Sequence, residues 1–246
     1  MSSANPPPGR YEGLTLRQAA LIAGIAYLLM PVTFAEFHAF PALLIPNHID
    51  QTTQNILAHQ TLFVVGMLCH LITLILDVVI AWALYVLFVP VNRALSLLAA
   101  WFRLVYTVIA FVGLFKLVTV FRLLTVPNFQ IVFGDQPLHA QVQLLLSSFR
   151  YEWSMSLVIF GIHLALVGYL ICRCSYIPKV LGILLIIVGA GWLIYPLKPY
   201  LYPSAPLDFI PWVGFGELVF PLWLVIMGWR IQEPALPHAA RATIGT

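Results

Sequence analysis

Charged side chains are scarce in this chain. Asp, Glu, Lys and Arg make up only 9% of the 246 residues, whereas about 25% is usual in a soluble domain. Twelve basic and nine acidic residues leave a net charge of +3. This composition excludes a soluble globular domain, a disordered chain and a basic nucleic-acid binder. With 61% hydrophobic residues and a mean hydropathy of +0.95, it indicates an integral membrane protein whose main partner is the lipid bilayer.

Cysteine, internal repeats and catalytic motifs are also few or absent. Cys172 and Cys174 are one residue apart, which fits neither a redox motif nor a zinc knuckle. No motif of the first half recurs in the second half, which argues against a transporter built from inverted repeats. We find no nucleophile elbow, phosphate-binding loop or known zinc motif. The sequence therefore leans away from an enzyme without excluding one, and it names no cofactor.

What the chain has instead is a series of long apolar segments. Each is long enough to cross a bilayer, which takes roughly 20 residues, and their continuous character favours helices over barrel strands. We therefore predict an all-α, polytopic transmembrane bundle of six spanning helices within residues 16–231, flanked by flexible tails at 1–15 and 232–246. The expected spans are at about residues 16–37, 57–89, 93–124, 151–173, 177–197 and 209–230.

Turn residues and polar stretches mark the connections. Pro90-Val91-Asn92 predicts a tight turn between the second and third spans. Five prolines between residues 195 and 211 exclude one continuous helix there. Residues 50–59 and 136–150 are polar and compatible with helix. We expect them to form short helices on the outer surface, leading into the second and fourth spans.

The basic residues predict an orientation. Three of them flank one set of helix ends and seven flank the other, so the positive-inside rule places the seven, and both termini, in the cytoplasm. The expected location is a bacterial inner membrane, crossed several times. The first apolar segment also has the length of a signal-peptide core, but no convincing cleavage site follows it. The seven residues are Arg10, Arg17, Arg93, Arg173, Lys179, Arg230 and Arg241, and the three are Arg122, Arg150 and Lys198.

Polar residues form stripes on several of these apolar helices. On the second, His59, Gly66, His70 and Asp77 are spaced seven, four and seven residues apart. Their directions around the helix axis therefore differ by no more than about 40°. Charged groups at bilayer depth are costly and often functional. The other stripes are Glu152, Ser156 and His163 on the fourth span, and Arg103, Tyr106 and Thr107 on the third.

The depths of these residues suggest one pair. At 1.5 Å per residue, Asp77 and Arg103 both lie about 20 Å from the Pro90–Asn92 turn. We predict that they form an ion pair across the helical hairpin, and a proton or ligand site is the alternative. Glu217 in the sixth span has no obvious partner in its own helix. Lys116 is expected to reach the outer surface, and Glu36 is expected to contact water.

Three stretches resemble a known family when taken together. They are Trp101–Tyr106; Gly161–Leu164 with Gly168–Leu170 and Tyr176–Gly182; and Gly216–Leu218 with Leu222–Leu224 and Gly228. Their order and spacing resemble a bacterial six-helix membrane family known as domain of unknown function 4386, over about residues 16–231. The resemblance implies the fold but no catalytic role. It also suggests that Asp77, Arg103, His163 and Glu217 belong to a shared pattern, whereas the proline-rich loop and the tails depart from it.

The polar stripes lead to one favoured function and several alternatives. We expect a non-enzymatic protein that binds a lipid, a lipophilic ligand or another membrane subunit, with a homo-oligomer also open. The site would be a polar cavity in the outer half of the bundle, and a closed hydrogen-bond network without a cavity is its alternative. The expected lining residues are His70, Asp77, Arg103, Tyr106, His163 and Glu217.

The alternative functions use the same residues differently. A membrane-embedded metal enzyme would take ligands from His70, Glu152, His163 and Glu217. A haem clamp would use the two histidines alone. A proton-coupled carrier would use Asp77 and His163.

Overall fold

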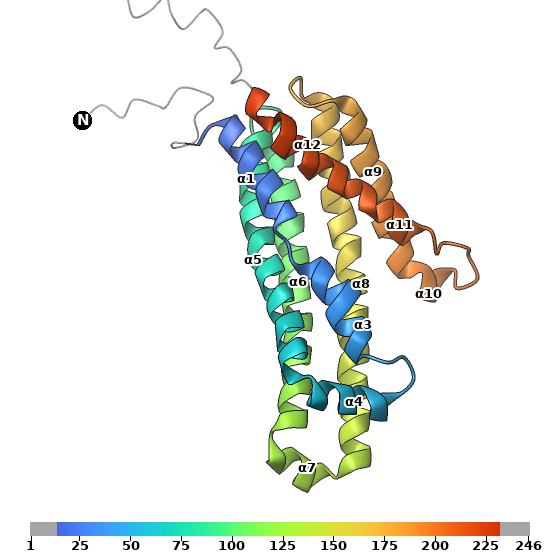
Figure 1. Ribbon diagram of the computed structural model, residues 1–246. Helices are drawn as coiled ribbons and strands as arrows, with labels where there is room; N and C mark the ends of the chain where they lie inside the picture. The colour runs from blue at the N-terminus through green and yellow to red at the C-terminus, as the bar shows by residue number, and fades with distance from the viewer. Residues whose placement is uncertain (1–13, 232–246) are drawn as a thin grey trace, which may run out of the picture.

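The computed structural model describes residues 14–231, which form helices and no strands. Six helical segments are long and apolar enough to cross a membrane, which confirms the all-α, six-helix prediction (Figure 1). The predicted tails lie outside the described residues, apart from residues 14 and 15 at the end of the first tail. The six segments are Leu16–Leu43, Gln60–Phe88, Arg93–Thr125, Asp135–Arg173, Lys179–Leu201 and Ile210–Arg230.

Local sequence explains where the helices begin. A capping box formed by Thr15 and Gln18 starts α1 (Leu16–Leu28). The turn Pro90–Asn92 separates α5 (Gln60–Phe88) from α6 (Arg93–Thr125), as predicted. The side chain of Asn92 then caps α6 by accepting a hydrogen bond from Leu95 N at 3.0 Å.

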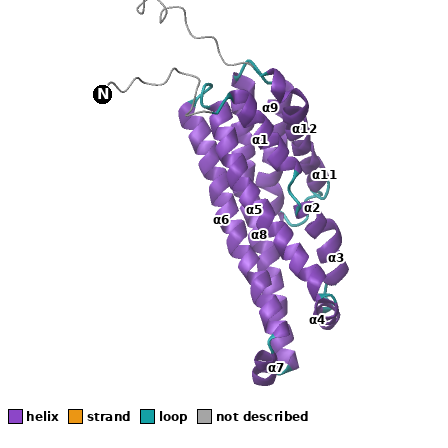
Figure 2. Cartoon of the chain, turned by 60° about the vertical axis from the view of Figure 1, so that its left-hand side comes forward, coloured by secondary structure: helices purple, strands orange, loops and turns teal. Residues whose placement is uncertain are grey.

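The spans pack in a closed ring. In order, α1, α5, α6, α8 (Asp135–Arg173) and α9 (Lys179–Ile194) contact their neighbours, and the sixth span closes the ring against α9 and α1. Figures 1 and 2 show the helices side by side in one bundle. The α8–α9 contact is close because glycines face each other: a Cβ on Gly168 would lie 2.5 Å from the carbonyl oxygen of Gly182.

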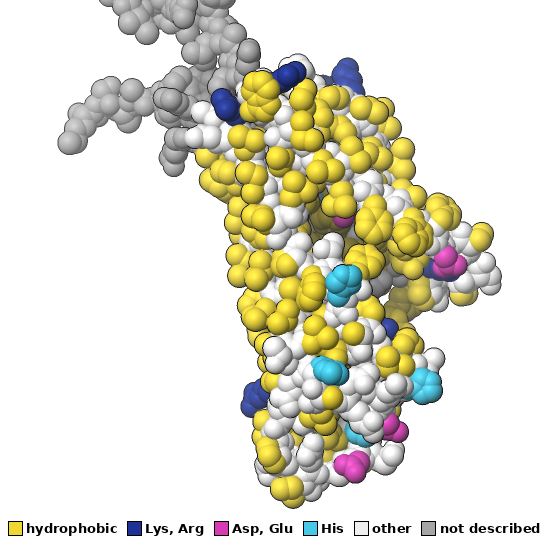
Figure 3. Space-filling model, in the orientation of Figure 1, with side chains coloured by type: hydrophobic (Ala, Val, Ile, Leu, Met, Phe, Trp, Pro, Cys, Tyr) yellow, Lys and Arg dark blue, Asp and Glu magenta, His cyan; other side chains and the backbone are white. Residues whose placement is uncertain are grey.

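The outside of the bundle is apolar. Large hydrophobic side chains such as Ile75, Val108 and Ile187 are more than half exposed, and Figure 3 shows hydrophobic side chains over most of the visible face. An exposed apolar surface of this extent suits contact with lipid. The chain is therefore a multi-pass membrane protein.

The expected outer helices differ from the observed ones in one place. Short helices do precede the second and fourth spans, namely α4 (Ile49–Ala58) and α7 (Pro127–Phe133). However, the prediction of a separate helix at residues 136–150 is wrong, because these residues are the first part of α8. Pro137 lies in the first turn, where proline is tolerated, and no later residue interrupts the helix.

The first and sixth spans are irregular where single helices were expected. The first breaks after α1 and continues as α2 (Val32–Phe34), a π-helix η1 (Ala35–Ala39) and α3 (Phe40–Leu43). The sixth consists of α11 (Ile210–Gly214), a 3-10 turn η3 (Phe215–Leu218), α12 (Val219–Met227) and a 3-10 turn η4 (Gly228–Arg230). The fifth ends in a 3-10 turn η2 (Tyr195–Leu197) and α10 (Lys198–Leu201).

The irregular parts of the first and sixth spans face each other. The rings of Phe37 in η1 and Phe215 in η3 have centroids 6.1 Å apart. Within a membrane, irregular backbone is tolerated where protein covers it or where it lines a cavity. This pair of segments therefore positions the site described next.

Candidate functional site

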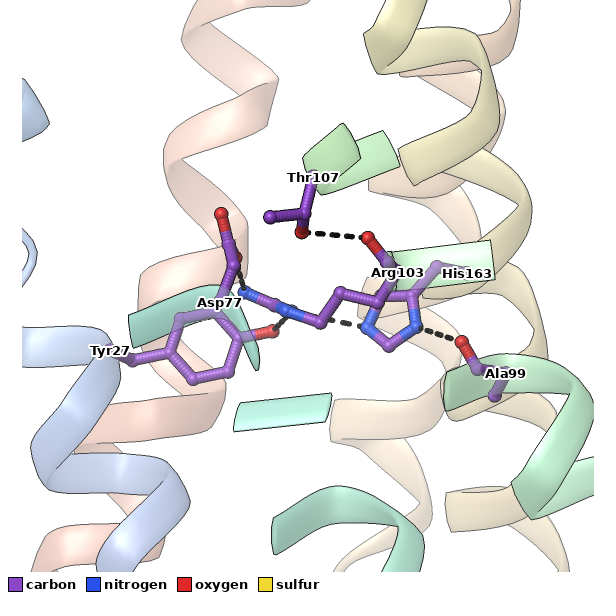
Figure 4. Close-up of polar contacts among 6 residues, drawn as sticks. All are labelled: Tyr27, Asp77, Ala99, Arg103, Thr107 and His163. Carbon is purple, nitrogen blue, oxygen red and sulfur yellow. Dashed lines mark hydrogen bonds and ion pairs between the residues drawn. The ribbon is translucent and has the colours of Figure 1, made fainter. Parts of the chain in front are cut away.

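Arg103 is the centre of a buried polar cluster that joins four helices. Its guanidinium donates from Nη2 to Asp77 Oδ1 on α5 at 2.5 Å, which confirms the predicted ion pair. From Nη1 it donates to the Tyr27 hydroxyl on α1, and the same nitrogen is 3.1 Å from His163 Nε2 on α8. Figure 4 shows these side chains pointing toward one another. Arg103, Asp77 and His163 are each at most 1% exposed.

The hydrogen bonds of His163 determine its protonation. Nδ1 lies 2.8 Å from the carbonyl oxygen of Ala99, and a carbonyl can only accept, so Nδ1 carries the hydrogen. Nε2 then presents its lone pair to the Arg103 guanidinium. His163 is therefore a neutral bridge between the guanidinium and the α6 backbone, and Asp77 and Arg103 together carry no net charge.

Tyr27 is a member of this cluster that sequence reasoning missed. Besides the hydrogen bond, the ring centroid of Tyr27 lies 4.5 Å from Arg103 Cζ. The ring centroid of Phe160, on α8, lies 5.4 Å from the same Cζ atom. Both contacts have cation–π geometry. The available signal was a tyrosine inside an apolar segment, since a buried phenol hydroxyl needs a hydrogen-bond partner.

Glu217 is the second carboxyl group of this region. It lies in η3 of the sixth span and interacts electrostatically with Arg103 and Asp77. It faces the indole of Trp192 on α9, yet neither Glu217 Oε2 nor Trp192 Nε1 has a hydrogen-bond partner of ordinary geometry among the described residues. Buried polar atoms are rarely left unpaired.

Two buried atoms of the central ion pair, Asp77 Oδ2 and Arg103 Nε, likewise have no hydrogen-bond partner in the part of the chain that the structure describes. Figure 3 shows a hollow in the face formed by the first and sixth spans, with an acidic side-chain atom recessed in it. The region therefore combines a neutral ion pair, an additional carboxyl group and several polar atoms with free hydrogen-bonding capacity.

His70 belongs to a different group of side chains. Its Nε2 is 3.0 Å from Glu36 Oε1 in η1, and its ring packs on Phe40 and Trp153 with centroids 5.4 and 4.9 Å apart. The side chain of Glu36 is 41% exposed, so it contacts both the surface, as expected, and the buried histidine. No contact joins His70 directly to Arg103 within residues 14–231.

Tyr106 lies between the two groups. Its ring centroid is 6.3 Å from Trp153, beside His70, and 4.9 Å from Phe160, beside Arg103. The structure thus arranges the six residues expected in one site as two clusters linked by aromatic rings, with Glu217 beside the Arg103 cluster.

Lys116 forms an ion pair on a partly exposed part of the bundle. Its Nζ lies 3.0 Å from Glu152 Oε1 on α8, and its side chain is 26% exposed. The two side chains meet because α6 and α8 pack together along this stretch. Glu152 is therefore engaged in a partly exposed ion pair, apart from the Arg103 cluster.

These contacts place the four candidate metal ligands separately. His70 binds Glu36, Glu152 binds Lys116, and His163 binds Arg103. Within residues 14–231, no three His, Cys, Asp or Glu side chains form a group that could hold a metal ion. The Nε2 atoms that a haem clamp would use face Glu36 and Arg103 instead.

Comparisons with known proteins identify a family but no function. The model of the family described as "Domain of unknown function (DUF4386)" matches residues 22–228, a range that includes Tyr27, the Arg103 cluster and Glu217. A protein of Archaeoglobus fulgidus with the name "Uncharacterized protein" is 32% identical over 160 residues, which are 65% of this chain and 82% of that protein. No solved structure is significantly similar.

Proposed function

The chain belongs to the family described as domain of unknown function (DUF4386), and we propose that it binds a lipophilic molecule whose cationic head group contacts Glu217. The observation that carries this proposal is the buried Oε2 atom of Glu217, which has no hydrogen-bond partner of ordinary geometry among residues 14–231 and lies beside an ion pair that is already neutral. Binding, rather than catalysis, is the role that this arrangement supports best.

The charges of the cluster favour a cationic head group. Asp77 neutralises Arg103 at 2.5 Å, and His163 is neutral in its bridging position. An ionised Glu217 would add one negative charge in surroundings of low dielectric constant, where an unpaired carboxylate is costly. An ammonium group would balance this charge and supply the hydrogen-bond donors that Glu217 Oε2 and Asp77 Oδ2 lack.

The surroundings favour a ligand with an apolar tail. Phe37 and Phe215 are 59% and 44% exposed beside the irregular segments of the first and sixth spans, so a molecule dissolved in the bilayer meets apolar side chains next to the carboxyl group. Discontinuous helices near the membrane midplane accompany binding sites in other membrane proteins. Such a ligand would enter sideways from the lipid.

The test uses three probes with the same twelve-carbon chain: dodecylamine, dodecanol and dodecanoic acid. Thermal unfolding of the detergent-purified protein is measured with each. A ligand at about 100 times its Kd adds roughly 2.7 kcal/mol to stability, so we expect dodecylamine to raise Tm by roughly 5 to 10 °C and the other two to have little effect.

Variants locate the effect. Glu217→Gln should abolish the stabilisation by dodecylamine, whereas Glu152→Gln, which removes a carboxylate elsewhere on the bundle, should retain it. Equal stabilisation by the three probes, or an unchanged dodecylamine effect in Glu217→Gln, would overturn the proposal.

A further inference from the structure

A pocket lies at the opposite end of the bundle from α4 and α7 (Figure 1). It has a volume of about 600 Å³ and is bounded by the α5–α6 turn at Pro90, the end of α8 at Arg173, the loop at Ser175 and Tyr176, and the end of the sixth span at Arg230. The Tyr176 hydroxyl donates to the carbonyl oxygen of Leu87 at 2.6 Å. This bond fixes the loop against the end of α5, so that wall of the pocket is held in place.

The pocket is positively charged. Arg173 and Arg230 both line it, and none of the described residues that line it is Asp or Glu. Neither arginine forms an ion pair within residues 14–231. Arg230 lies over the ring of Trp229, with Cζ 4.9 Å from the centroid. Two guanidinium groups without an ion pair among the described residues, in a pocket that Ser175 also lines, are suited to a phosphate group, which arginine binds through paired hydrogen bonds.

The position of the pocket is that of a lipid head group. Arg173 and Arg230 are the last residues of their spans, and Trp229 is half exposed beside them, as is typical of the membrane–water interface. Figure 3 shows Lys and Arg side chains gathered at this end of the bundle. Basic pockets between spanning helices at an interface are places where anionic lipid head groups bind.

We propose that the pocket between Arg173 and Arg230 binds a phosphate group, carried by an anionic glycerophospholipid of the adjoining leaflet. The acyl chains of the lipid would lie along the exposed apolar side chains of the sixth span, such as Ile226. This site is separate from Glu217 and requires a ligand of the opposite charge, so its test is independent of the proposed function.

The experiment measures lipid binding to the delipidated full-length protein by native mass spectrometry. The probes are dioleoyl phosphatidylglycerol, dioleoyl phosphatidylcholine and inorganic phosphate. The test variant is the double substitution Arg173→Gln with Arg230→Gln. The matched control is Arg93→Gln with Lys179→Gln, which removes two positive charges at the same end of the bundle but outside the pocket.

We expect the wild type to prefer phosphatidylglycerol. The pocket variant should bind it roughly 10- to 30-fold more weakly, and the control should differ from the wild type by less than about threefold. Because both arginines are exposed, folding of the variant is expected and is checked by circular dichroism. Binding of inorganic phosphate that depends on the two arginines, without binding of phosphatidylglycerol, would retain the phosphate site and overturn its lipid source.

Two results would contradict the site itself. Equal losses of phosphatidylglycerol affinity in the pocket variant and the control would mean that binding reflects the general positive charge at this end of the bundle. Equal binding of phosphatidylcholine and phosphatidylglycerol by the wild type would mean that the pocket does not select an anionic lipid.

Discussion

Arg103 on α6 lies level with Asp77 on α5, and their Nη2 and Oδ1 atoms are 2.5 Å apart in the interior of the bundle. The tight turn at Pro90–Asn92 places both residues about 20 Å along their helices. The pair therefore fixes the register of the helical hairpin at a depth where a lone charge would be costly.

This pair leads to a stability prediction. Removing one partner, as in Asp77→Asn or Arg103→Met, should lower the free energy of unfolding by about 3 to 5 kcal/mol, because the other charge remains buried without a partner. The double variant should lose less than the sum of the two single losses. Denaturant unfolding in mixed micelles measures the cycle, and strictly additive losses would show that the two side chains do not interact.

The bridging role of His163 can be tested by an amide side chain. Gln at this position can donate to the Ala99 carbonyl and accept from Arg103, whereas Leu can do neither. His163→Leu should therefore be less stable than His163→Gln by about 1 to 3 kcal/mol, the cost of buried polar groups left unpaired. The same unfolding assay measures the difference, and equal stability of the two variants would contradict the bridge.

The close approach of α8 and α9 makes a third prediction. Gly168→Ala should destabilise the protein by about 1 to 3 kcal/mol, because the new methyl group meets the backbone of Gly182 at 2.5 Å. Gly113→Ala on α6 is the matched control. Its Cβ would meet its nearest neighbour at 3.5 Å, so we expect no loss and a gain of up to about 1 kcal/mol. A neutral Gly168→Ala would contradict the packing.

The orientation of the bundle is tested by labelling single cysteines in a background in which the three native cysteines are replaced. Asp208 lies between the fifth and sixth spans and Arg93 at the start of the third, so the six-span topology puts them on opposite sides of the membrane, and both are exposed. With both termini in the cytoplasm, a membrane-impermeant maleimide added to intact cells should label Asp208→Cys and should not label Arg93→Cys. The reverse pattern would invert the orientation inferred from the basic residues.

Hydropathy was sufficient to predict the six spans, but it does not detect helix that continues beyond the membrane. The 39 residues of α8 extend about 58 Å, well past a hydrocarbon core of about 30 Å. Residues 136–150 are polar for that reason, and polarity alone predicts a separate helix there. The Asp77–Arg103 pair was predictable because a short turn relates the depths of two adjacent helices.

The sequence pattern did not predict contacts between side chains on helices that no short turn connects. Glu36 reaches His70 because the first span breaks and contains a π-helix, and an apolar segment gives no indication of where it bends. Lys116 meets Glu152 because α6 packs against α8, and the faces that two helices turn toward each other depend on packing rather than on composition. Tyr27 carries no charge, so the free-energy cost that points to ionised residues inside the bilayer does not point to it.

The most direct test of the account is to map where a lipophilic amine binds. A photoreactive alkyl amine carrying a diazirine is crosslinked to the protein in its membrane, and the labelled peptides are identified by mass spectrometry. We predict labelling of the segments that contain Phe37 and Phe215, and loss of that labelling in Glu217→Gln. Labelling spread evenly over the exposed faces of α5 and α6, unchanged by Glu217→Gln, would contradict a ligand site at this carboxyl group.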